Sequence, residues 1–295
     1  MSSTISLARS RAELPKSKTE LASHVYARSK DYVLYNGDSL ALLDQFEDQT
    51  FDLIFADPPY FLSNGGFTCQ GGKRAAVKKG EWDQSNGLES DHAFTTAWLK
   101  QCQRLLKPTG TIWVSGTQHV IFSVGFAMQQ LGYKLLNTVT WYKPNASPHL
   151  ACRYFTHSTE LLVWASPQGG KGKLQHKFNY HDMKAANGGK QMRDAWALPK
   201  TGEEELSDDG EGKLWTMTTP KPSEKSHGRH PTQKPIALLE RLVDACTDDD
   251  ALVLDPFCGS GTTGVAAVGK GRRFVGIDMN TEYLDLTKRR IEAAK

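Results

Sequence analysis

One segment, residues 251–264, constrains the fold of this chain more than any other. Its sequence, Ala251-Leu-Val-Leu-Asp-Pro-Phe-Cys-Gly-Ser-Gly-Thr-Thr-Gly264, is typical of an apolar strand that ends in an acid, turns through glycines and enters a helix. Glycine lets the backbone of such a turn approach a ligand closely. A second apolar segment, 273–278, also ends in an acid, where nucleotide-binding sheets hold a ribose. The pair predicts a ribose-containing ligand at the edge of a parallel sheet. The alternative is a glycine turn in an ordinary βα unit.

The charge of this turn narrows the choice of ligand. Gly259, Gly261 and Gly264 have a spacing like that of dinucleotide-binding loops, but Asp255 would repel a pyrophosphate lodged beside it. An ammonium or sulfonium group would instead be attracted to this carboxylate. A Walker-type phosphate site is excluded because the chain contains no GxxxxGK[ST] sequence.

The rest of the chain alternates short apolar runs with helical patterns, which predicts an α/β fold. Strands are expected at 32–36, 51–56, 111–115, 136–142, 160–165, 251–255 and 273–277. Helices are expected at about 90–106 and 118–131, and at 235–247, 261–269 and 281–293, with Pro235 in a first turn. The alternation stops between about 166 and 230, which indicates an insertion with a separate role.

Cysteine usage and hydropathy exclude several classes of protein. The five cysteines form no CxxC pair and have no nearby histidine at metal-ligand spacing, so we expect neither a disulfide framework nor a metal site. No window approaches the roughly 18 apolar residues that a membrane span needs, and the N-terminus lacks the apolar core of a secretion signal. These features favour a cytoplasmic protein without a membrane partner.

The tetrapeptide Asp57-Pro58-Pro59-Tyr60 follows the apolar run 51–56 and suits a site that grips a planar base with an amino group. The lone pair of such an amine is delocalised into the ring, so a methyl acceptor of this kind needs hydrogen-bond acceptors for its N–H groups. The Asp57 carboxylate and the Pro58 carbonyl are two acceptors, and the prolines restrict the backbone that carries them. Tyr60 can stack on the base, a contact worth about 1–3 kcal/mol.

Together with Asp255 to Gly261, this tetrapeptide resembles the amino-group DNA methyltransferases that use S-adenosylmethionine. The order of the motifs, with the tetrapeptide first and the glycine turn last, is similar to the beta class of that family. Further matches are Asn36-Gly37-Asp38, Trp141-Tyr-Lys-Pro144, His157-Ser-Thr-Glu160 and His230-Pro-Thr-Gln-Lys-Pro235. The resemblance covers most of residues 31–293. It implies an open, mostly parallel twisted sheet with helices on both faces and a permuted motif order.

The resemblance also implies cofactor-binding roles, which we carry onto the matching positions. The ribose would be held by Asp278, the adenine amino group would lie near Asp38, and the adenine face would pack on Phe257. The methionine side would be lined by Gly259, Gly261 and Thr262, near Asp255, with Thr232 and Lys234 at its carboxylate. For Asp38 the alternative is a helix cap.

DNA is the implied partner, double-stranded or single-stranded, and the base must be flipped out of a duplex to reach the sheet edge. The formal net charge of +3 is too small to indicate a polyanionic partner, so local basic stretches carry this expectation. The candidate DNA contacts are Lys73, Arg74, Lys78 and Lys79 in the basic stretch 71–80, which would hold phosphates, and Lys184, Lys190 and Arg193 in the basic stretch 171–193. The alternative for both stretches is a solvated loop.

Four segments follow from these motifs. We expect a flexible N-terminal segment at 1–30, a catalytic half at 31–165, a target-recognition insertion at 166–228 and a cofactor-binding half at 229–295. The two halves, 31–165 and 229–295, would form one catalytic domain, present as a monomer or a homodimer.

Further stretches, such as Phe61-Leu-Ser-Asn-Gly-Gly66 and Lys79-Gly-Glu-Trp-Asp83, resemble the second methyltransferases of DpnII-type restriction systems. This implies N6 of adenine in GATC as the target. One alternative is an N4-cytosine enzyme, although that branch usually has Ser at the position of Asp57. The other alternative is an inactive DNA-binding homologue, although both motifs are intact here.

Overall fold

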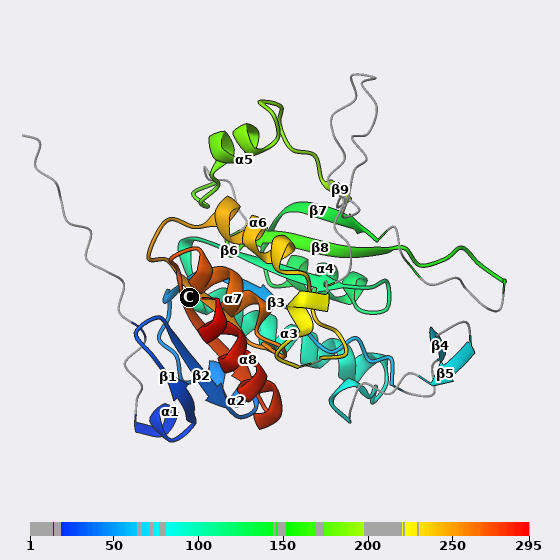
Figure 1. Ribbon diagram of the computed structural model, residues 1–295, viewed down its shortest axis with the longest axis horizontal. Helices are drawn as coiled ribbons and strands as arrows, with labels where there is room; N and C mark the ends of the chain where they lie inside the picture. Colours follow the sequence, from blue (N-terminus) through cyan, green and yellow to red (C-terminus); the bar gives the residue numbers. More distant parts are fainter. Residues whose placement is uncertain are drawn as a thin grey trace, which may run out of the picture.

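The computed structural model in Figure 1 describes residues 14, 19–63, 67–70, 73–76, 81–143, 146, 152–168, 174–197, 220, 222–228 and 230–294. Of residues 67–70, 73–76, 81 and 222 only the backbone is described.

A nine-stranded sheet forms the centre of the described part, in the order β1-β2-β11-β10-β3-β6-β8-β7-β9. The strands are β1 (Val25–Arg28), β2 (Tyr32–Asn36), β3 (Phe51–Ala56), β6 (Leu106–Gly116), β7 (Lys134–Tyr142), β8 (Thr159–Ser166), β9 (Ala195–Ala197), β10 (Leu252–Asp255) and β11 (Arg273–Asp278). The five strands from β2 to β6 in this order are parallel, and β1 and β8 pair antiparallel to their neighbours. The predicted open, mostly parallel sheet is therefore confirmed.

Helices cover both faces of the sheet (Figure 1). The first face carries α2 (Ser39–Leu43), α3 (Leu88–Leu105) and α4 (Ile121–Gln130), and the second carries α6 (Ile236–Cys246), α7 (Thr262–Gly269) and α8 (Thr281–Ala293). The remaining elements are α1 (Thr19–Ser23), α5 (Tyr180–Ala186), the short helices η1 (Glu81–Asp83) and η2 (Pro222–Lys225), and a separate hairpin of β4 (Phe67–Gln70) and β5 (Lys73–Ala76). None of the described helices has the length and apolar character needed to cross a membrane.

The site depends on the pairing of β3 with β10. Leu53 and Ile54 of β3 lie opposite Val253 and Leu254 of β10, although about two hundred residues separate them in sequence. From β3 the chain continues to β6 on one side, and from β10 it continues to β11 on the other. The two strands therefore form the switch point where open α/β sheets bind ligands beyond their carboxyl ends.

Three regions differ from the sequence expectations. Within the segment 1–30, expected to be flexible, residues 19–28 form α1 and β1, and Leu21 is buried. A single turn and a four-residue edge strand are too short to produce a periodic pattern.

Pro235 is the N-cap of α6 and not part of its first turn, because the helix begins at Ile236.

Within the expected insertion 166–228, β9 extends the nine-stranded sheet by one edge strand. Trp196 in β9 pairs with Trp141 in β7, and Met183 and Trp196 are buried in the core under α6. Asn179 also donates to the carbonyls of Asp244 and Thr247. Residues 169–173, 198–219 and 221 of this segment lie outside the described residues.

Candidate active site

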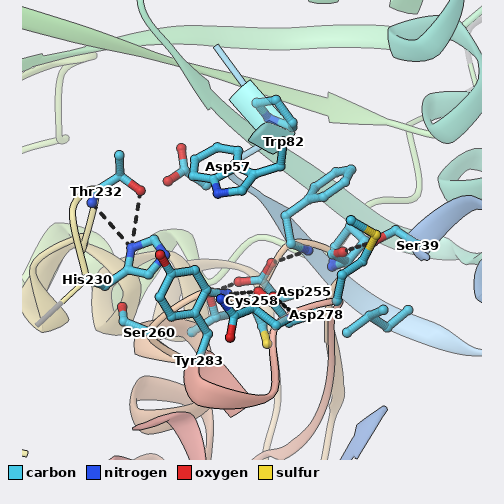
Figure 2. Close-up of a pocket in the computed structure, with 18 of the residues that line it drawn as sticks. Ser39, Asp57, Trp82, His230, Thr232, Asp255, Cys258, Ser260, Asp278 and Tyr283 are labelled. Atoms are coloured by element: carbon cyan, nitrogen blue, oxygen red, sulfur yellow. Dashed lines mark hydrogen bonds between the residues drawn. The ribbon is translucent and has the colours of Figure 1, made fainter. Parts of the chain in front are cut away.

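A cavity of about 730 Å³ lies at the carboxyl ends of β3, β10 and β11. Its wall combines residues from both sequence halves, and Figure 2 shows Asp57 and Trp82 across the cavity from Asp255 and Asp278. Its volume falls within the range of about 300–1,000 Å³ that is usual for small-molecule sites.

The structure brings most of the expected site residues to this cavity. Asp38, Thr232, Lys234, Asp255, Phe257, Gly259, Thr262 and Asp278 line it, and so do Asp57 and Pro59. Three expected residues, Pro58, Tyr60 and Gly261, are not part of the lining.

Asp255 and Asp278 form the floor of the cavity at the ends of β10 and β11. Asp255 accepts hydrogen bonds from Phe257 N at 3.0 Å and from Thr263 Oγ1 at 2.5 Å. Asp278 accepts from Gly259 N at 2.9 Å and from Asn280 N at 2.8 Å. Burial raises the pKa of Asp255 to about 7 and also raises that of Asp278. A ligand that supplies positive charge or hydrogen-bond donors would stabilise the ionised form of both carboxyl groups.

The glycine turn is held from below by α8. Thr287 Oγ1 donates to Gly259 O at 2.9 Å, and Arg290 Nη1 donates to Ser260 O at 2.5 Å. Gly261 has φ +70°, and a Cβ on it would lie 2.4 Å from Thr287 Cγ2. Gly261 was expected beside the ligand, but it faces Thr287 instead. Its lack of a side chain allows the turn to pack on α8.

Two more of the expected cofactor residues also have structural contacts. Asp38 is the N-cap of α2 and accepts from Ala41 N at 3.0 Å, while it also lines the cavity. The two roles proposed for Asp38 are compatible, because a carboxylate has more than one acceptor site. Phe257 packs edge-on against Trp98, with ring centroids 5.5 Å apart, and this contact fixes its ring at the cavity wall.

Asp57 is the centre of a buried hydrogen-bond network. Its Oδ1 accepts from Tyr60 Oη at 2.7 Å and from Ser115 Oγ at 2.5 Å. Its Oδ2 accepts from Lys234 Nζ at 2.5 Å. Described residues thus occupy three of about four acceptor sites and leave one on Oδ2 for a ligand amine.

Tyr60 does not present its ring to the cavity. The side chain is buried, and its hydroxyl contacts Asp57 and Ser115. The backbone around it is fixed by Asp83, which is fully buried and accepts from Tyr60 N at 2.9 Å and Leu62 N at 3.2 Å. Stacking of a base on Tyr60 would require the ring to leave its contact with Asp57.

Lys234, expected near a ligand carboxylate, contacts protein carboxylates instead. Its ammonium lies 2.5 Å from Asp57 and 3.7 Å from Glu160, and Glu160 also contacts Lys143 at 2.7 Å. Burial lowers the pKa of Lys234, but the two carboxylates outweigh it and raise the pKa above its ordinary value.

The expected DNA contacts fall into two groups. Lys184, Lys190 and Arg193 are exposed, and they lie in α5 and in the segment that joins it to β9. Lys73 and Arg74 lie on β5, where only the backbone is described, and Lys78 and Lys79 lie outside the described residues.

Sequence reasoning missed several residues of the site. Ser115 at the end of β6 contacts Asp57, and Trp82 and Tyr283 line the cavity. Ser115 is the last residue of the strand predicted at 111–115, so its position at a carboxyl end was the available signal. No such signal marks Trp82 in η1 or Tyr283 in α8, because these two helices reach the cavity only through tertiary packing.

Comparisons with known proteins agree with this arrangement. A family model described as DNA methylase matches residues 51–289. Type II methyltransferase M2.LlaDCHI of Lactococcus lactis subsp. cremoris is 45% identical over 271 residues, which cover 92% of this chain and 93% of that protein. Type II methyltransferase M2.DpnII of Streptococcus pneumoniae is 44% identical over 273 residues, covering 92% and 94%.

Two solved structures share the fold at low sequence identity. The cytosine-N4-specific PvuII DNA methyltransferase has a TM-score of 0.64 at 19% identity, covering 89% of this chain and 86% of that chain. The M1.HpyAVI–SAM complex has a TM-score of 0.56 at 22% identity, covering 88% and 98%.

Proposed function

This chain belongs to the DNA methylase family and is a DNA methyltransferase, and from that premise we propose that it methylates N6 of a flipped adenine with S-adenosylmethionine. The similarity to M2.DpnII confirms the resemblance to the second methyltransferases of DpnII-type restriction systems. The observation that carries the proposal is the placement of Asp57 across one cavity from Asp255 and Asp278. Asp57, which can accept hydrogen bonds from an amine, and the floor carboxylates Asp255 and Asp278, which suit a nucleoside cofactor, line the same cavity.

The residues of the floor fit S-adenosylmethionine. Asp278, at the end of β11, is placed to accept hydrogen bonds from ribose hydroxyls, and Asp38 keeps acceptor capacity for an adenine amino group. Gly259 has φ +48° and lets the turn reach the cavity. When bound, the cofactor supplies an electrophilic methyl group on a sulfonium, which leaves as a neutral thioether.

Asp57 and Pro58 provide the acceptor side of the reaction. Hydrogen bonds from the two N–H groups of N6 to the Asp57 carboxylate and the Pro58 carbonyl would direct the N6 lone pair out of conjugation. That lone pair forms the new N–C bond, and N6 then carries a positive charge until it loses one proton. Asp57 offsets the developing charge, and an ionised carboxylate is also able to accept the proton.

A duplex base must leave its stack to reach Asp57, at a cost of a few kcal/mol. We propose that stacking on Tyr60 offsets part of this cost after the ring turns from Asp57. Contacts of the basic side chains Lys73, Arg74, Lys78 and Lys79 with phosphates would offset more, as would those of Lys184, Lys190 and Arg193.

The proposed target is adenine in GATC, on single-stranded or double-stranded DNA. The similarity to M2.DpnII supports this proposal. Since chromosomal and incoming DNA meet such an enzyme in the cytoplasm, we propose that location as well.

N4 of cytosine is the second candidate, because the PvuII enzyme with the same fold is cytosine-N4-specific. Asp57 favours adenine over this alternative, since the N4-cytosine branch usually carries Ser at this position.

Nucleoside analysis tests both candidates. Purified protein is incubated with labelled S-adenosylmethionine and with oligonucleotides that contain or lack GATC, single- and double-stranded, and the nucleosides are identified by mass. Label in N6-methyladenine only with GATC is the expected result. Label in N4-methylcytosine would overturn the base assignment, and label in adenine without GATC would overturn the target.

A further inference from the structure

Four ionisable side chains of alternating charge lead from the cavity into the protein. Asp57 lies 2.5 Å from Lys234, Lys234 lies 3.7 Å from Glu160, and Glu160 lies 2.7 Å from Lys143. Their side chains are only 7% to 18% exposed. Asp57 and Lys234 line the cavity, whereas Glu160 and Lys143 do not. Glu160 is therefore placed to act on a ligand through Lys234. We refer to these four residues as the charge chain.

The contact between Lys234 and Asp57 opposes the proposed reaction. N6 gains positive charge during methyl transfer, and the Asp57 carboxylate is the group that offsets it. An ammonium 2.5 Å from the same carboxylate cancels much of its field and places a like charge beside N6. Transfer is therefore expected to be faster when Lys234 moves away from Asp57.

Glu160 offers the ammonium a second carboxylate at short range. Contacts between an ammonium and a carboxylate close at about 2.7–2.9 Å, so a shift of about 1 Å converts the 3.7 Å separation into such a contact. Lys234 is an ammonium beside either carboxylate, because together they raise its pKa against the effect of burial. The exchange therefore needs no proton transfer and no change of net charge.

We propose that Glu160 is a positioning residue that takes the Lys234 ammonium from Asp57 when the target amino group enters the cavity. Asp57 then gives its acceptor sites to the amine. Lys143 shares Glu160 with Lys234 and so limits how strongly Glu160 attracts it. This inference rests on the proposed function, since the amine is its trigger.

Neutralising Glu160 tests the exchange. Glu160→Gln keeps the shape and the hydrogen-bonding capacity toward Lys143, but it removes the charge that attracts Lys234. The single-turnover methylation rate is expected to fall about tenfold, the usual effect of one lost charge-assisted contact, with S-adenosylmethionine affinity and DNA KM unchanged. Glu160→Asp, which restores the charge, is expected to recover most of this rate.

Asp52→Asn is the matched control. Asp52 at the start of β3 is also a partly buried carboxylate with a lysine partner, Lys107 at 2.8 Å, but it lies at the opposite end of the strand from the cavity. It should keep the single-turnover rate near that of the wild type. Equal losses in Asp52→Asn and Glu160→Gln would show a general effect of lost ion pairs and overturn the inference.

Lys143→Met decides the question if Glu160→Gln does not fold. Lys143→Met removes a cation 2.7 Å from Glu160, so Glu160 should attract Lys234 more strongly and transfer should accelerate about threefold. A fall in rate with intact cofactor affinity would overturn the inference, because a purely structural ion-pair chain predicts that result. If the wild type forms no N6-methyladenine, the proposed function fails and the inference falls with it. If the wild type is active and Glu160→Gln methylates at the same rate, the inference is wrong but the proposed function stands.

Discussion

Substituting alanine for Gly261 tests the reason for the glycine turn. Gly261 has φ +70°, a conformation that costs a non-glycine residue about 1–2 kcal/mol. The added Cβ would lie 2.4 Å from Cγ2, 2.6 Å from Oγ1 and 2.7 Å from Cβ of Thr287, all part of a buried side chain. Overpacking of this kind costs about 1–3 kcal/mol more. Gly261→Ala is therefore expected to lower the free energy of unfolding by about 2–5 kcal/mol.

Gly271 provides a matched control for the backbone contribution. Its φ is +74°, but a Cβ on it would have no neighbour within 4 Å in the described part of the chain. Gly271→Ala should therefore cost only about 1–2 kcal/mol, the conformational contribution. The difference between the two variants, measured by urea unfolding at equilibrium, isolates the contact with Thr287.

The affinity for S-adenosylmethionine should also differ between Gly261→Ala and Gly271→Ala. Thr287 Oγ1 holds Gly259 O at 2.9 Å, so a displaced Thr287 shifts the turn that lines the cavity. Calorimetric titration with S-adenosylmethionine should show weaker binding for Gly261→Ala and unchanged binding for Gly271→Ala. Unfolding free energies that agree within about 0.5 kcal/mol would refute the argument from the close contact.

Three further outcomes are expected. Asp57→Ala should abolish methyl transfer while calorimetry still detects S-adenosylmethionine binding, because Asp57 lies across the cavity from the nucleoside floor; loss of both would place Asp57 in the cofactor site. The pKa of Asp255 is raised by burial to about 7, above its value of about 4 in an unfolded chain, so the folded state favours the neutral acid. Stability without cofactor should fall as pH rises from about 4 to about 7, and urea unfolding of Asp255→Asn should lack this slope. Arg290→Met removes donors to Ser260 O and Thr262 Oγ1 and should lower the unfolding free energy by about 1.5–3 kcal/mol, measured by urea unfolding.

The strands and the larger helices were predictable because their patterns are local. The runs 51–56 and 273–277 coincide with β3 and β11 within a residue, and the helix expected at 281–293 coincides with α8. Apolar periodicity and the cap at Asn280 depend only on neighbours in sequence. Short elements such as α1 and β9 were missed, since three to five residues carry too little pattern.

The residue types that do the chemistry were also readable from the sequence. Asp57 follows an apolar strand, Asp255 and Asp278 end one each, and the parallel sheet places all three at one edge. The strands that lead to Asp57 and Asp255, β3 and β10, pair directly with each other in the sheet.

Only the tertiary structure decided what each of these side chains contacts. Lys234 was expected at a ligand carboxylate and lies against Asp57, Tyr60 was expected to face the base and is buried, and Gly261 faces Thr287. The sequence determined which strands end in acids, because that depends on local order along the chain. Pairings across 177 or 26 residues, such as Lys234 with Asp57 or Gly261 with Thr287, depend on how the helices pack over the sheet. No local pattern records that packing, since it is set by the shapes of side chains that meet only in the folded protein.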